Sequence, residues 1–405
     1  MLSAGTNAVN LVPDPPRQLG SSQLLANARA MTTEQKAVER LSVVDRFLPL
    51  WILAAIGLGL ACGRAFPGLP HALDAVKVAG VSVPIAIGLF WMMYPVLARV
   101  RYGELSHLRK RGRLLATSLV LNWVVGPFLM FALAWLLLPD LPHYRTGLIL
   151  IGLARCIAMV LIWNMLARGS GEVAAVLVAL NSLFQIAFYS LLGWLFITVV
   201  PTWLGAGGEA FHVSVWTIAK SVLLFLGLPL LAGALTRTIG ERARGRDWYE
   251  KKFLPRLGPT ALLALLYTIV LMFAMQGDRI TRLPVDVVRI AVPLLLYFVL
   301  MFGGSFLLAW RLGFSYEETA SLSFTAAGNN FELAIAVAIG TFGIASGEAL
   351  AGVVGPLIEV PALISLVYIS LWMKARLFPK SGDAVLPRRV RGLTPHPPSP
   401  PEVSK

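Results

Sequence analysis

Charged residues, cysteine and histidine are all scarce in this chain of 405 residues. Charged residues make up 14% of the sequence, whereas hydrophobic residues make up 57%. The two cysteines, Cys62 and Cys156, both fall within or at the edge of apolar runs, and neither looks like a disulfide partner. All five histidines fall outside these runs, so nothing supports an intramembrane zinc hydrolase with paired histidine ligands.

Long apolar runs are abundant. The mean hydropathy is +0.73, and a run of about 18 apolar residues is long enough to cross a bilayer as a helix. We expect ten spans, near residues 47–63, 79–98, 114–138, 146–167, 172–200, 214–236, 259–275, 289–310, 318–344 and 349–373. The sequence therefore predicts an all-α polytopic membrane protein. Its transporter domain would cover residues 46–376, between a disordered extension at 1–45 and a Pro-rich disordered tail at 377–405.

The net charge of +14 would suggest nucleic acid as the partner of a soluble protein, but its distribution indicates a membrane topology instead. If the N-terminus is cytoplasmic, 27 lysines and arginines lie on the cytoplasmic side of the predicted spans and six on the opposite side. This imbalance follows the positive-inside rule. We therefore expect a multi-pass protein of the cell membrane with both termini in the cytoplasm, and no nucleic acid as partner.

Ten spans divide into two sets of five. Because five is an odd number, a second set with the same internal layout must be inverted in the membrane, as in many carriers. The first repeat would be 46–200 and the second 213–373. The fourth span then matches the ninth, and we expect both helices to be broken and to cross near the midplane. No clear sequence identity relates the halves, so this symmetry is inferred from order and content.

The predicted ninth span carries the strongest functional signal. Residues 324–343 read FTAAGNNFELAIAVAIGTFG, in which Gly328, Asn329 and Asn330 interrupt an apolar run and Glu332 follows. A carboxylate at bilayer depth costs several kcal/mol unless it faces a polar cavity or a partner. The pattern is typical of a broken helix at a transport site. The alternative is an amide and acid that only join two helices.

The fourth and tenth spans carry the remaining candidates. Arg155, Cys156 and Asn164 lie in the fourth, where the guanidinium would favour the thiolate form of the cysteine. Cysteine on its own often behaves as a small buried hydrophobe. Glu359 lies between Pro356 and Pro361 in the tenth span. It would either bind a proton or cation, or pair with Arg155 or an amide.

The sequence lacks the motifs of several other functional classes. The sequence has no HExxH and no P-loop GxxxxGK[ST], and no segment suits a nucleotide-binding domain, which argues against an ATP-driven pump. We expect no cofactor, no bound metal and no enzymatic activity. Polar residues are scattered singly along different spans, which disfavours a selectivity-filter channel. The functional class that remains is a secondary carrier.

Four segments resemble the arsenical-resistance family of arsenite efflux permeases, in the bile acid, arsenite and riboflavin transporter superfamily. They read GLARCIAMVLIWN (152–164), NSLFQIAFYS (181–190), GNNFELAIAVAIGTFG (328–343) and SGEALAGVVGPLIEVPALI (346–364). The resemblance covers about residues 45–376. It implies arsenite efflux, possible transport of antimonite, and roles in transport for Cys156 and Glu332.

The chemistry of trivalent arsenic agrees with the roles that the resemblance implies for Cys156 and Glu332. Trivalent arsenic is thiophilic, and a single thiolate at Cys156 would bind it and still release it. Arsenous acid is mostly uncharged near neutral pH, so exchange for a proton carried by Glu332 would supply the driving force. Asn164, Asn329 and Asn330 would bind the arsenic hydroxyls.

Arg155 and Glu359 would support this site. Two other functions stay open: a sodium-coupled importer of an organic anion, as elsewhere in the superfamily, and a membrane sensor or scaffold. The sequence leaves the oligomeric state open.

Overall fold

Helices make up nearly all of the structure. A computed structural model describes residues 48–73, 75–78, 81–100, 112–205, 213–282, 284–343 and 346–378. The predicted extension at 1–45 and nearly all of the predicted tail lie outside these residues. Six continuous helical segments are long and apolar enough to cross a membrane, and shorter apolar helices accompany them. The prediction of a helical polytopic membrane protein is confirmed.

The first half of the chain contains helices and one small hairpin of strands. Its elements are α3 (Leu48–Ala65), α4 (Leu69–Leu73), β1 (Lys77–Val78), β2 (Val81–Ser82), α5 (Val83–Ala98), α6 (Gly112–Val120), η2 (Leu121–Val125), α7 (Gly126–Leu137), α8 (Pro142–Leu153), α9 (Met159–Leu166), α10 (Gly171–Trp194), η3 (Leu195–Val199) and α11 (Val200–Trp203). β1 and β2 pair in antiparallel fashion.

The described residues of the second half form helices joined by short connections. Its elements are α12 (Val215–Val222), η4 (Leu223–Gly227), α13 (Leu228–Arg244), α14 (Arg246–Trp248), η5 (Tyr249–Phe253), α15 (Leu254–Arg282), α16 (Pro284–Arg311), α17 (Tyr316–Ala327), α18 (Phe331–Phe342) and α19 (Gly347–Leu377).

The segments η2 to η5 are single π-helical turns, and each ends two residues before a proline. The prolines are Pro127, Pro201, Pro229 and Pro255, each the second residue of the helix that follows its π turn. Proline lacks a backbone N–H and its ring clashes with the carbonyl four residues earlier. A wider turn removes that clash without ending the helix, so these spans continue past their prolines.

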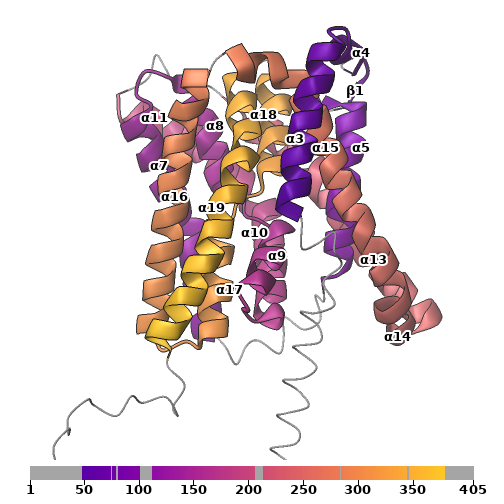
Figure 1. Cartoon of the computed structure of the whole chain (residues 1–405), viewed down its shortest axis with the longest axis vertical. Helices are drawn as coiled ribbons and strands as arrows, with labels where there is room; N and C mark the ends of the chain where they lie inside the picture. The colour runs from indigo at the N-terminus through magenta and orange to yellow at the C-terminus, as the bar shows by residue number, and fades with distance from the viewer. Residues whose placement is uncertain are drawn as a thin grey trace, which may run out of the picture. The chain divides into compact units, whose positions relative to one another are not determined.

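The helices from Pro49 onward belong to one unit and pack in two neighbouring groups. α5 packs against α13 and α15, and Figure 1 shows these helices beside α3. The other group surrounds α8, α17 and α18, where α16 packs on α17 and α19 packs on both α8 and α18. α12 joins the groups, because it contacts α10 and α18 and continues through η4 into α13.

Candidate functional site

Two interrupted helices meet at the centre of the second group. α8 ends at Leu153 and α9 begins at Met159, while α17 ends at Ala327 and α18 begins at Phe331. The two interruptions lie side by side as an antiparallel bridge between Arg155 and Asn329. We refer to residues 154–156 and 328–330 as the crossing.

Backbone groups freed by one interruption are paired by the other. The Cys156 N–H donates to the Gly328 carbonyl at 3.3 Å, and the Asn330 N–H donates to the Ala154 carbonyl at 2.9 Å. Non-helical backbone at membrane depth survives only where such partners satisfy it. Each interruption therefore stabilises the other.

Gly328 lies where the two interruptions approach each other closely. A Cβ atom at this position would lie 3.0 Å from the Cys156 Cβ and 3.2 Å from the Phe324 carbonyl oxygen. Both distances are shorter than ordinary van der Waals contact, so a side chain here would require the Cys156 side chain or the end of α17 to shift by a few tenths of an ångström.

Asn329 and Asn330 hold the crossing with their side chains. The Asn329 amide nitrogen donates to the Ile151 carbonyl at 2.8 Å and to the Ala154 carbonyl at 3.3 Å. The Asn330 amide oxygen caps α18 by accepting the Leu333 N–H at 3.0 Å. One polar atom of each asparagine, Asn329 Oδ1 and Asn330 Nδ2, remains buried without a hydrogen bond.

Cys156 is buried at the crossing, with 3% of its surface exposed. Its sulfur accepts the Val160 N–H at 3.3 Å. The carboxylates of Glu332 and Glu359 both lie close enough for their charges to act on this thiol. The structure therefore brings together the thiol and the two acids that the sequence singled out.

Glu332 and Glu359 differ in exposure and partners. Glu332 is the second residue of α18 and is half-buried, and the N-terminus of a helix favours a negative charge. Glu359, in the middle of α19, is 4% exposed and faces the backbone N–H of Asn329. One of its oxygens, Oε1, is buried without a hydrogen bond.

Arg155 is fully buried, and its contacts decide whether it pairs with Glu359. Its Nη1 donates to the Tyr297 hydroxyl at 2.8 Å and to the Ala326 carbonyl at 3.3 Å, and its backbone N–H donates to Gln185. Among the described residues no ion pair joins Arg155 to Glu359. The Nε and Nη2 atoms of Arg155 are buried without a hydrogen bond, so two strong donors next to the crossing are unused.

Asn164 lies apart from the crossing, near the C-terminal end of α9. Its amide oxygen accepts the Ser321 hydroxyl at 2.8 Å and its amide nitrogen donates to the Ser170 carbonyl at 3.2 Å. These contacts join the end of α9 to α17. Asn164 is therefore the one predicted site residue that the structure does not bring to the others.

Tyr297 and Gln185 contribute to the site although neither was among the candidate site residues. Tyr297 belongs to α16 and binds Arg155, while Gln185 belongs to α10 and accepts the Arg155 N–H. A lone tyrosine in an apolar span was the only signal for Tyr297, and an aromatic core residue has the same signature. Gln185 belongs to a polar face of α10 at four-residue spacing, whose member Tyr189 binds the Leu150 carbonyl of α8 at 2.9 Å.

A second polar region lies at the N-terminal ends of α8 and α19, at the opposite end of α8 from the crossing. A cleft of about 660 Å³ is lined by residues that include Asp140, His143 and Glu348. His143 Nδ1 lies 2.8 Å from an oxygen of the fully buried Glu348 carboxylate. Arg289 binds Asp140 with two nitrogens and holds the pKa of that carboxyl below its ordinary value.

A helical membrane protein in which two interrupted helices cross and gather ionisable side chains has the architecture of a membrane transporter. Comparison with known proteins agrees with this class. The family model described as Sodium Bile acid symporter family matches residues 86–283.

Relatives with similar sequences identify the family. The arsenical-resistance protein Acr3 of Corynebacterium glutamicum is 55% identical over 355 residues, which cover 88% of this chain and 95% of that protein. Acr3 of Alkaliphilus metalliredigens is 33% identical over 338 residues, covering 80% and 92%. An uncharacterized transporter of Synechocystis sp. is 38% identical over 353 residues, covering 82% and 90%. The chain belongs to the Acr3 family of arsenical-resistance proteins, which confirms the resemblance found in the sequence.

Proposed function

We propose that this chain exports arsenite across the cell membrane in exchange for protons. The observation that carries the proposal is the grouping of one thiol and two carboxylates, Cys156, Glu332 and Glu359, where two interrupted helices cross. The names of two relatives, both arsenical-resistance proteins, suggest the class of substrate.

Cys156 binds the metalloid in this mechanism. Its thiol attacks arsenous acid, one arsenic hydroxyl leaves as water with the thiol proton, and a single sulfur–arsenic bond forms. The same bond is hydrolysed by water on the other side of the membrane. A single soft ligand gives exchangeable binding, whereas three thiolates would hold the metalloid too tightly for transport.

Glu332 couples transport to protons. It is the half-buried acid of the pair and lies on the first turn of α18, so it can exchange a proton with water that enters the site. Because arsenous acid is uncharged, the membrane potential alone cannot concentrate it outside the cell. A carboxyl that accepts a proton from outside and releases it inside supplies that work.

Four further side chains hold the arsenic hydroxyls of the bound substrate: Arg155, Asn329, Asn330 and Glu359. Each has at least one buried polar atom without a hydrogen bond, and such atoms are costly unless water or a ligand satisfies them. Arsenic hydroxyls would provide these partners. Asn164 would bind substrate only after giving up its bonds to Ser321 and Ser170.

The membrane arrangement that we propose has two inverted repeats of five helices. Residues 46–200 form the first repeat and residues 213–373 the second, within a transporter domain that ends at residue 376. The order of elements supports this division, because the interrupted pair α8 and α9 is fourth in one half and the interrupted pair α17 and α18 is fourth in the other. Both termini are cytoplasmic in this arrangement.

Everted membrane vesicles test the function directly. The unaltered protein should accumulate arsenite when an inside-acid pH gradient is imposed, and Cys156→Ala or Glu332→Gln should abolish accumulation. Cys62→Ser is the matched control, because Cys62 lies on α3. Full activity in either site variant would remove that residue from the mechanism.

A sodium-coupled importer of an organic anion is the second candidate function. The matching family model, whose description names sodium and bile acid, favours it. Liposomes containing the purified protein separate the two functions when sodium and proton gradients are varied independently. Uptake of an organic anion that requires sodium, without arsenite flux, would establish the second.

A further inference from the structure

A basic hairpin, residues Arg237–Arg256, connects α13 to α15. The chain reverses at Gly245, whose φ of +82° and ψ of 157° belong to a region used almost only by glycine. The Gly245 N–H donates to the Glu241 carbonyl at 3.0 Å and closes the end of α13. The hairpin contains seven lysines and arginines but only three acids.

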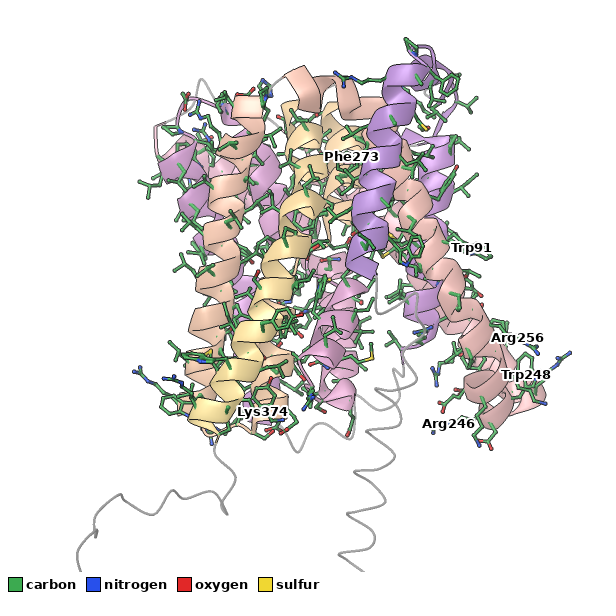
Figure 2. All side chains as sticks on the ribbon, viewed as in Figure 1. Trp91, Arg246, Trp248, Arg256, Phe273 and Lys374 are labelled. Atoms are coloured by element: carbon green, nitrogen blue, oxygen red, sulfur yellow. The ribbon has the colours of Figure 1, made fainter. Side chains whose placement is uncertain are left out.

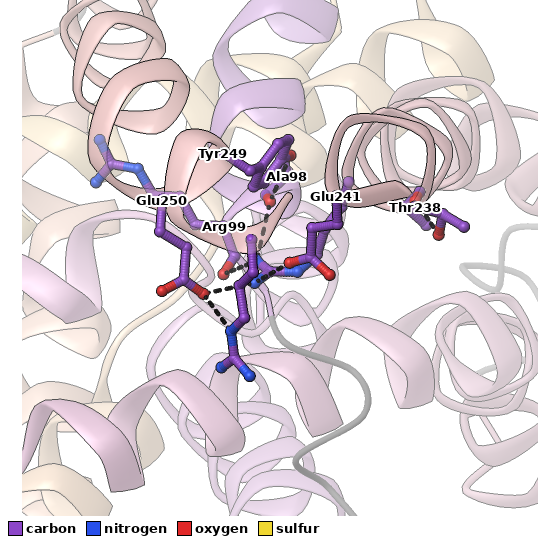
Figure 3. Close-up of polar contacts among 9 residues, drawn as sticks. Ala98, Arg99, Thr238, Glu241, Tyr249 and Glu250 are labelled. Atoms are coloured by element: carbon purple, nitrogen blue, oxygen red, sulfur yellow. Dashed lines mark hydrogen bonds and ion pairs between the residues drawn. The ribbon is translucent and has the colours of Figure 1, made fainter. Parts of the chain in front are cut away.

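All three acids of the hairpin are engaged within it. Glu241 lies 2.8 Å from Arg237, and Asp247 lies 2.8 Å from Lys251. Glu250 binds Arg237 at 3.0 Å and Arg246 at 3.1 Å. Figure 3 shows Glu241 and Glu250 directed inward, toward the C-terminal end of α5.

This network is anchored to α5 through Arg237 and Tyr249, and Glu241 and Glu250 lie beside that anchor, whereas Asp247 is exposed and pairs with Lys251. Arg237 donates to the Arg99 carbonyl at 3.1 Å, and the Tyr249 hydroxyl donates to the Ala98 carbonyl at 3.1 Å. Gly233 allows the close packing beneath it, because a Cβ there would lie 2.8 Å from the Ala98 nitrogen. The hairpin is thus a fixed surface of the protein.

Four basic side chains remain on the outer surface of the hairpin. Arg242, Arg244, Lys252 and Arg256 are exposed and have no acidic partner among the described residues. Trp248 lies among them, because the Arg244 guanidinium is 4.7 Å from its ring centre and Phe253 stacks on it. Figure 2 shows Arg246, Trp248 and Arg256 grouped near the tip of the hairpin.

The level of this surface relative to the bilayer follows from helix geometry. The largely apolar segment from Val215 to Leu235 is about 30 Å long, which equals the thickness of the hydrocarbon core. Arg242 then lies about 10 Å further along the helix axis, at the depth of the lipid headgroups. A tryptophan near that level is typical of a side chain at the interface.

We propose that the basic hairpin binds the headgroups of anionic phospholipids. Its four unpaired cations match a phosphate-bearing surface in charge, and three of them are arginines, whose planar guanidinium can donate two parallel hydrogen bonds to one phosphate. Attraction between basic side chains and an anionic leaflet is effective within about one Debye length, the distance at which these residues lie. This inference is independent of what the protein transports.

Native mass spectrometry of the full-length protein tests the proposal. The protein would be purified in neutral detergent with equal amounts of phosphatidylglycerol and phosphatidylcholine, and the ratio of the two retained lipids measured. The unaltered protein should prefer phosphatidylglycerol. A variant with all four unpaired cations changed to glutamine should lose at least tenfold of that preference, because each basic residue near a membrane surface contributes about fivefold.

A matched control removes four cations from other helix ends that carry basic residues. Its changes are R113Q, R311Q, K374Q and R376Q, and Figure 2 shows Lys374 near the end of α19, separate from the hairpin. This control should lose clearly less of the preference than the hairpin variant, because Lys374 is paired with Glu317 and Arg113 binds the Leu312 carbonyl. An equal loss in both variants would show a general effect of charge and would overturn the proposal.

Two further outcomes would also overturn it: no preference in the unaltered protein, or a preference that survives the four changes. If the fourfold variant does not purify as a single species, the double variant R242Q/K252Q gives the same readout at two exposed positions. The logarithm of its phosphatidylglycerol-to-phosphatidylcholine ratio should fall by about half as much as in the fourfold variant. An unchanged lipid ratio would contradict the proposal.

Discussion

Serine substitution of the two neighbouring asparagines should have unequal effects on stability. Asn329 donates two hydrogen bonds across the crossing, to Ile151 and Ala154, and a serine hydroxyl is too short to reach either carbonyl. Asn330 accepts one hydrogen bond as the N-cap of α18, and serine caps a helix about as well as asparagine. Both changes remove the same atoms, so each serves as the control for the other.

The expected difference in the free energy of unfolding follows from the number of hydrogen bonds that each substitution removes. Each buried hydrogen bond contributes about 0.5–1.5 kcal/mol net. The Ile151 and Ala154 carbonyls each keep a backbone partner, Ala154 N–H and Asn330 N–H, so no buried acceptor is left unsatisfied. Asn329→Ser should therefore cost about 1–3 kcal/mol more than Asn330→Ser.

Unfolding of the purified protein in mixed micelles, titrated with a denaturing detergent, measures this difference. The reasoning predicts a clearly lower midpoint for Asn329→Ser. Equal midpoints, or a lower one for Asn330→Ser, would refute the assignment of Asn329 as the residue that joins the two interruptions.

Three other substitutions should act through local geometry. Gly328→Ala should reduce arsenite flux in liposomes more than tenfold while the protein still folds, because its Cβ would press on Cys156 at 3.0 Å; unchanged flux would contradict the close packing. Gly245→Ala should lower stability by about 1–3 kcal/mol in the same detergent titration, because alanine is strained at its backbone angles; a neutral result would argue against this turn. His143→Ala should lower the thermal midpoint more than His143→Gln, because only glutamine can still donate to the buried Glu348 carboxylate, and equal midpoints would show that this bond contributes nothing.

The sequence predicted much of the site because polar residues are rare in the apolar runs. Asn329, Glu332 and Glu359 were each singled out by chemistry that has no ordinary place in lipid, and Cys156 by its neighbour Arg155 and the family resemblance. The structure brings all four together. Asn164 has the same signature, but its amide joins α9 to α17. A polar residue in a span satisfies hydrogen bonds wherever its helix places it, and one sequence does not say which neighbour that will be.

Amino-acid order alone determined the helical class, the long apolar segments and the presence of a break at Gly328, because hydropathy and helix propensity are local properties. Tertiary structure alone decided what each break is paired with, since the bridge between Arg155 and Asn329 joins residues far apart in the chain. It also decided that Arg155 binds Tyr297 and leaves Glu359 to the Asn329 backbone. Partners of this kind depend on how helices pack, and packing follows from contacts between distant residues that no local pattern contains.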